Sequence, residues 1–130
     1  MIDNRSIPSS TVIPEVPYRD VSEAAGWLAA VFGFTVRVRI GDHRVQMNVG
    51  DGAIVVVEGE PQASRLLVRV ENADEHHRRA SAAGADVLRT PADHPFGERQ
   101  YNVRDFAGHY WTFSQSIADV APEEWGGVTS

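Results

Sequence analysis

The sequence predicts an α+β fold built from two copies of a strand–helix–strand–strand–strand (βαβββ) module. A segment with helical spacing of apolar residues is followed by three segments in which apolar and polar residues alternate. The same order of elements recurs 51 residues later, where Gly33 falls on Gly84 and Val36 on Val87. A repeat of this length and order indicates a duplicated module.

The first module covers about residues 11–60. Residues 11–18 are expected to be extended, since Pro14 and Pro17 keep the preceding residues out of the helical region. A helix is predicted at 21–32, with Asp20 or Ser22 as its cap and Gly33 as its left-handed end. Three strands separated by glycine turns follow, at Phe34–Ile40, His43–Val49 and Ala53–Glu58.

The second module covers about residues 64–116 and repeats this order. Its helix is predicted at 73–83, and its strands at Leu66–Val70, Asp86–Thr90, Glu98–Val103 and His109–Gln115. The prolines and glycine of residues 91–97 indicate a loop. A mobile lead-in (1–10) and a tail (117–130) complete a single domain of residues 1–130.

The composition excludes several classes of function. With 12 Lys and Arg against 18 Asp and Glu, the net charge of -6 opposes binding to nucleic acid or to an anionic membrane surface. No apolar run approaches the roughly 20 residues that span a bilayer. There is no cysteine for disulfides or thiolate chemistry, and the polar N-terminus does not look like a secretory signal. A cytoplasmic location is therefore expected.

Two segments carry a family resemblance. "YRDVSEAAGWLAAVFGF" resembles the opening helix of the vicinal-oxygen-chelate superfamily, which includes glyoxalase I, bleomycin-resistance proteins and extradiol dioxygenases. "ERQYNVRDFAGHYWTFSQ" resembles its closing hairpin, with Phe106 in place of the usual proline. The resemblance covers about residues 12–115. It implies that the two modules form a cupped mixed sheet, and that two chains form a homodimer.

The resemblance also implies where metal-using members place their ligands. In this sequence those positions are Ile13, Arg65 or Leu66, Thr112, and a fourth near Glu58. Only Glu58 offers a carboxylate, and a divalent cation needs several anionic or imidazole donors together. We therefore expect no catalytic metal and no other cofactor. The adjacent His76 and His77 are interpreted as part of a solvated helix face.

The strand alternation predicts which residues a ligand would meet. Large apolar residues should face the helices, which leaves a polar set on the opposite face. Phe96 and Trp125, in a loop and the tail, are candidate stacking groups or lids. The predicted ligand-binding residues are Arg39, Gln46, Asn48, Phe96, Gln100, Asn102, Tyr110, Thr112 and Trp125, with no catalytic residue assigned.

These observations lead to a binding hypothesis. The resemblance to metal-free resistance proteins implies a small-molecule-binding protein that sequesters an aromatic natural product or antibiotic. The alternative is a lyase, isomerase or dioxygenase that uses a metal or acid–base residues. A third interpretation is a metal-free accessory domain of a biosynthetic cluster.

Overall fold

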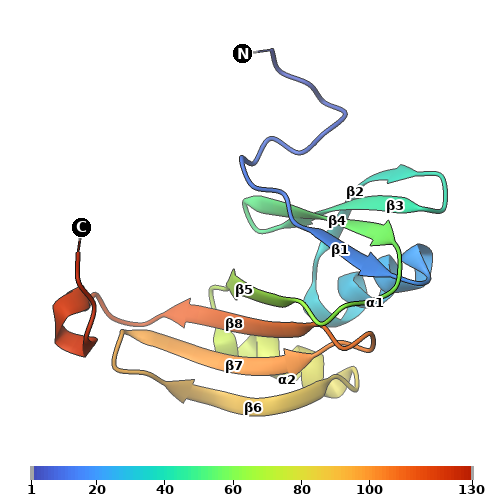
Figure 1. Ribbon diagram of the computed structural model, residues 1–130. Helices are drawn as coiled ribbons and strands as arrows, with labels where there is room; N and C mark the ends of the chain where they lie inside the picture. The colour runs from blue at the N-terminus through green and yellow to red at the C-terminus, as the bar shows by residue number, and fades with distance from the viewer. Residues whose placement is uncertain (1, 130) are drawn as a thin grey trace. The chain divides into compact units, whose positions relative to one another are not determined.

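The computed structural model describes residues 2–129 and confirms the predicted α+β fold (Figure 1). The chain divides between Ser64 and Arg65 into two compact units, each with one four-stranded mixed sheet and one α-helix. No helix in the described residues is long and apolar enough to cross a bilayer.

The first unit contains the sheet β1-β4-β3-β2, with β1 parallel to β4 and the other pairs antiparallel. Helix α1 packs against β2, β3 and β4. Asp20 caps this helix by accepting a hydrogen bond from the backbone N–H of Glu23, as predicted. The elements are β1 (Glu15–Tyr18), α1 (Val21–Phe32), β2 (Thr35–Ile40), β3 (Arg44–Val49) and β4 (Gly52–Glu58).

The second unit repeats the topology as β5-β8-β7-β6, with β5 parallel to β8. Helix α2 packs against β6, β7 and β8. A short 3-10 helix, η1 (Pro122–Trp125), lies in the tail. The other elements are β5 (Arg65–Arg69), α2 (Ala73–Ala82), β6 (Asp86–Asp93), β7 (Glu98–Arg104) and β8 (Tyr110–Ser116).

The 51-residue repeat extends to details of the backbone. Gly33 and Gly84 follow the two helices and both have left-handed φ, at 80° and 85°. A β-bulge interrupts the pairing of β2 with β3 between Val36 and Val38, and another interrupts β6 with β7 between Val87 and Arg89. Each bulge adds one residue, so it reverses which face the following side chains occupy.

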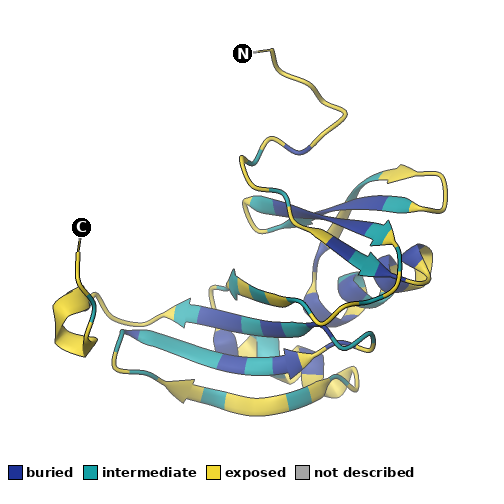
Figure 2. Cartoon of the chain, viewed as in Figure 1, coloured by how far each residue is buried: buried dark blue, intermediate teal, exposed yellow. Residues whose placement is uncertain are grey.

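The two helices bury different kinds of side chain against their sheets. Helix α1 contributes large apolar residues, including Leu28 and Phe32, onto a sheet surface rich in valine. Helix α2 buries only Ala73 and Ala80 among its residues, and its sheet supplies the bulk. The fully buried Tyr101, Trp111 and Phe113 fill that space, and Figure 2 shows the buried band along β7 and β8. Large residues thus oppose small ones, as close packing requires.

A buried carboxylate holds the turn before β8. One oxygen of Asp105 accepts hydrogen bonds from the backbone N–H groups of Ala107 and His109, each at 3.0 Å. The other oxygen accepts the indole N–H of Trp111, also at 3.0 Å. This pairing explains why the closing hairpin carries Asp and Trp at that spacing. It also fixes the start of the strand on which Tyr110 lies.

The structure corrects two predictions in the second unit. Strand β6 continues through Pro91 to Asp93 instead of ending at Thr90, because the proline lies on an edge strand beside a register shift. His76 does not lie on a solvated face. Its ring packs on Phe113 with centroids 4.0 Å apart, and its Nδ1 is hydrogen-bonded to the Tyr101 hydroxyl.

Two glycine-to-alanine substitutions should separate backbone strain from helix propensity. In Gly84→Ala the added Cβ meets no neighbour, so its cost comes from the left-handed φ and should be about 1 kcal/mol of unfolding free energy. Gly26→Ala lies on the exposed face of α1, again in open space, and should stabilise by about 0.5–1 kcal/mol. Urea unfolding measures both, and a stabilising Gly84→Ala would contradict the left-handed assignment.

Candidate small-molecule site

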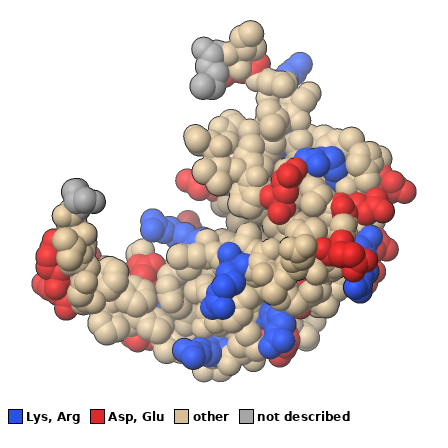
Figure 3. Space-filling view, viewed as in Figure 1, with Lys and Arg blue, Asp and Glu red and all other residues tan. Residues whose placement is uncertain are grey.

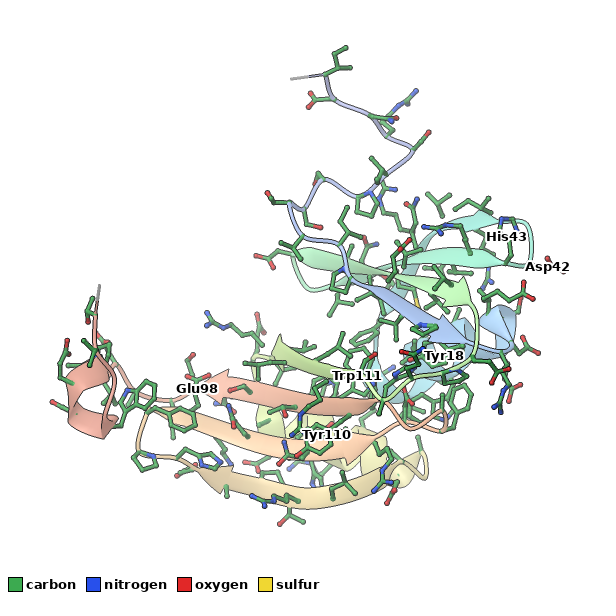
Figure 4. All side chains as sticks on the ribbon, viewed as in Figure 1. Tyr18, Asp42, His43, Glu98, Tyr110 and Trp111 are labelled. Atoms are coloured by element: carbon green, nitrogen blue, oxygen red, sulfur yellow. The ribbon has the colours of Figure 1, made fainter. Side chains whose placement is uncertain are left out.

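The candidate site lies on the face of the second sheet that α2 leaves uncovered. Strand register aligns its side chains in rows: Arg65 beside Tyr110, Leu67 beside Thr112 and Asn102, and Arg69 beside Ser114 and Gln100. The alternate residues, such as Trp111 and Phe113, point toward the helix and are fully buried. Figure 4 labels Tyr110 and Trp111 as neighbours at the start of β8, and Glu98 toward the other end of the sheet.

A shallow hollow of about 300 Å³ opens on this face. The guanidinium carbon of Arg65 lies 4.3 Å from the centroid of the Tyr110 ring, which is a cation–π contact. Leu67, 70% exposed, adds an apolar surface beside it. The hollow is lined by Arg65, Leu66, Leu67, Gln100, Tyr110 and Thr112. Three of the predicted ligand-binding residues, Gln100, Tyr110 and Thr112, therefore come together.

Hydrogen bonds connect the polar side chains of the same face. Asn102 donates to the Thr112 hydroxyl at 2.8 Å, and Gln100 donates to the Ser114 hydroxyl at 3.0 Å. Ser114 in turn donates to Glu98 at 2.7 Å. Hydrogen bonds from Ser116 and Ser114 lower the pKa of Glu98, burial opposes them, and attraction to Arg69 adds to the lowering. Glu98 is therefore a carboxylate at neutral pH.

The structure corrects the predicted contribution of the first sheet. Gln46 is buried and so is not available to a ligand. Its amide donates a hydrogen bond to the Ser6 carbonyl at 2.8 Å and accepts one from Arg37. Arg37 also donates to the Arg5 carbonyl at 2.9 Å. Residues 5 and 6, which the sequence predicts to be part of a mobile lead-in, therefore cover this part of the sheet. They supply the partners that a buried amide needs.

The bulge in β2 changes the position of Arg39. It places Val38 opposite Gln46 and Arg39 opposite Val45, whose side chain is buried on the α1 side. Arg37, not Arg39, is the arginine beside Gln46. Asn48 stays on the uncovered side and donates to the Thr35 hydroxyl at 3.3 Å. Alternation alone could not have located the bulge.

Phe96 and Trp125 meet each other away from Tyr110. Their ring centroids are 5.3 Å apart, and the His94 ring stacks on Phe96 with centroids 5.1 Å apart. The tail reaches this cluster because the Ile117 N–H donates to the Gly97 carbonyl at 2.8 Å. Strand β8 runs from Tyr110 to Ser116, so about 20 Å of strand separates the two aromatic sites. One small planar ligand cannot contact both within this unit.

The positions implied for metal ligands do not offer a suitable donor set. Arg65, not Leu66, lies on the uncovered face, and its guanidinium stacks on Tyr110. The Thr112 hydroxyl accepts a hydrogen bond from Asn102. Glu58 pairs with Tyr18, whose buried side chain places this row on the α1 side of its sheet. Ile13 has no donor atom. A cationic guanidinium and a neutral hydroxyl do not fit a divalent metal.

The sequence profile of the Glyoxalase/Bleomycin resistance protein/Dioxygenase superfamily matches residues 12–113. The chain therefore belongs to this superfamily. Among solved structures it is similar to TioX from Micromonospora sp. ML1, with 34% identity, a TM-score of 0.76, and coverage of 84% of this chain and 100% of that one. No curated protein matches the sequence.

More distant structures share the fold. A glyoxalase/bleomycin resistance protein from Streptomyces sp. CB03234 is 24% identical, with a TM-score of 0.70 and coverage of 82% of this chain and 100% of that chain. Lactoylglutathione lyase from Agrobacterium tumefaciens is 16% identical, with a TM-score of 0.70 and coverage of 85% and 96%. At these identities the likeness concerns the fold, which supports many different chemistries.

The lowered pKa of Glu98 predicts a pH-dependent contribution to stability. A carboxylate with a depressed folded pKa stabilises above its unfolded pKa, and this contribution is lost as pH falls through the folded value. The difference in unfolding free energy between wild type and Glu98→Gln should therefore shrink as pH falls from about 7 to about 3, which urea unfolding at a series of pH values would measure. Glu71→Gln, on the surface, is the control. A difference independent of pH would contradict the assignment.

Proposed function

We propose that this protein binds a planar aromatic small molecule, of the natural-product or antibiotic type, on the uncovered face of its second sheet. The observation that carries this proposal is the Arg65–Tyr110 stack beside the exposed Leu67. A stacked pair and an adjacent apolar side chain suit a flat ring, and pairs of this kind contribute about 0.5–1.5 kcal/mol beyond area burial.

The polar side chains around the hollow would fix the orientation of the bound ligand. Hydrogen bonds between β7 and β8 link Gln100 to Ser114 and Asn102 to Thr112. The remaining donors and acceptors of these side chains therefore have fixed directions. Such a preorganised polar set selects among ligands of similar size. Asn48 of the first sheet and the Phe96–Trp125 cluster are proposed as additional contacts for a larger ligand.

Capture without turnover is part of the proposal. The residues at the family's metal positions do not form a donor set, and the residues that line the hollow include no carboxylate. Glu98, toward the other end of the same face, is held by serine hydroxyls. Sequestration requires affinity alone, so this arrangement is sufficient for it. We place this function in the cytoplasm, because a chain without cysteine needs no oxidising compartment.

Ligand binding should depend on the Tyr110 ring. In a thermal-shift screen of planar aromatic natural products, a compound at 100 times its dissociation constant should stabilise the protein by about 2.7 kcal/mol. For such a compound, Tyr110→Ala should weaken binding about tenfold, whereas Tyr110→Phe keeps the ring and should stay within about twofold. Calorimetric titration measures both. Equal losses in the two variants would show that the ring does not contact the ligand.

Two further measurements test how far the site extends and whether the protein is a catalyst. Trp125→Ala should leave binding of a compact ligand unchanged, since Trp125 lies at the other end of the sheet. A loss equal to that of Tyr110→Ala would indicate a ligand that spans the face. Purified protein with about one divalent metal per chain, and turnover abolished by chelators and by Glu58→Gln, would overturn the non-catalytic assignment.

We also propose that the protein is a homodimer. Each four-stranded sheet ends in two edge strands, and open edges favour pairing with another chain. The exposed apolar side chain of Leu88 lies on one of these edge strands, β6. Light scattering at micromolar concentration should give twice the chain mass. A mass of 14.3 kDa would contradict the proposal.

A further inference from the structure

Arginine is concentrated on the uncovered face of the second sheet, although the protein as a whole is acidic. All 12 basic residues of the chain are arginine, and the net charge is -6. Strand register places Arg65, Arg69 and Arg89 on this face, opposite Tyr110, Ser114 and Asn102 respectively. Figure 3 shows basic side chains spread over these strands.

These three arginines lie outside the ion pairs of the described residues, and only Arg69 interacts electrostatically with a carboxylate, that of Glu98. Within residues 2–129, none of them forms an ion pair, whereas Arg19, Arg44, Arg99 and Arg104 each do. The acidic residues of the face are already engaged. Asp86 pairs with Arg104 at 3.6 Å, and Glu98 accepts the Ser114 hydroxyl. Among the described residues of this face, four arginines (Arg65, Arg69, Arg89 and Arg104) stand against two carboxylates, Asp86 and Glu98, so the face carries an excess of positive charge.

The geometry of Arg65 prepares it for an anion. The carbon of its guanidinium lies over the Tyr110 ring, 4.3 Å from the ring centroid, and a guanidinium held against an aromatic ring keeps N–H donors for other partners. Arginine binds a carboxylate through two parallel hydrogen bonds from the edge of its guanidinium. A stacked guanidinium loses less conformational entropy on binding than a free side chain, because it is already ordered.

The spacing of the charged groups sets the size of the ligand. Arg65 and Arg69 are four residues apart on β5, or about 13 Å, and Arg89 lies three strands away, or about 14 Å. Leu67 and Thr112 lie between them. A bicyclic aromatic ring can therefore rest on Leu67 and Thr112 while a carboxylate on its edge reaches Arg65.

From these observations, and given the small-molecule site proposed above, we propose that the ligand of this face is an anion, a planar aromatic carboxylate held at its carboxylate by Arg65. Arg69 and Arg89 attract it through the local field. A neutral or cationic aromatic compound of the same shape gains the ring contacts but lacks the charge-assisted hydrogen bonds, and a cation is repelled.

Three naphthalene compounds of matched shape test this inference by calorimetric titration at low salt: naphthoate, naphthamide and naphthylmethylammonium. Naphthoate should bind at least about tenfold more tightly than naphthamide, the gain expected from charge-assisted hydrogen bonds. The cation should bind most weakly. Raising the salt concentration should weaken naphthoate and leave naphthamide unchanged, because only the first interaction is screened.

Arg65→Gln should remove the preference for naphthoate, so that naphthoate and naphthamide bind this variant with similar affinity. Arg78→Gln is the matched control, because it removes the same charge from an exposed position on α2, which covers the opposite face of the sheet. Naphthamide binding as tight as naphthoate, or an equal loss of naphthoate in both variants, would overturn the anion assignment and leave the aromatic site standing. Failure of all three probes to bind wild type at up to about 5 mM would overturn the proposed site itself.

Discussion

Each sheet of this protein has one helix, and a helix can cover only one face of a sheet. Alternate side chains of every strand therefore remain on a face that the helix does not cover. The two units differ in whether another segment of the chain covers that face. In the first unit the chain's own residues 5 and 6 provide carbonyls to Arg37 and Gln46. In the second unit, none of the described residues 65–129 lies over Tyr110 and Thr112 in this way, and the hollow stays open.

The buried side of the second sheet positions the open side. Trp111 and Phe113 pack beneath α2, and the indole of Trp111 is held by Asp105. Because successive side chains of a strand point to opposite faces, fixing Trp111 and Phe113 also fixes Tyr110 and Thr112. The helix contributes alanines at the contact, so the aromatic residues of the sheet can fill the core without moving the strands apart.

Duplication with divergence accounts for the difference in chemistry between the units. The left-handed glycines and the bulges are equivalent in both, so the backbone scaffold is the same. The side chains on that scaffold differ. Strand β1 presents Glu15, which Arg44 neutralises, whereas β5 presents Arg65, which rests on an aromatic ring. The first arrangement is satisfied internally, and the second leaves hydrogen-bond donors for a ligand.

The sequence by itself determined the two modules, the limits of both helices to within a residue, and the existence of all eight strands, because these follow from local periodicity and caps. It also indicated that Gln100, Tyr110 and Thr112 share a face, because β7 and β8 alternate without interruption. Only the tertiary structure decided the rest. The bulge that moves Arg39 depends on pairing with β3, and the burial of Gln46 depends on a segment 40 residues away. His76 meets Phe113, and Arg65 meets Tyr110, through contacts distant in sequence. Local propensity carries no information about such partners, since their geometry is set by strand register and packing.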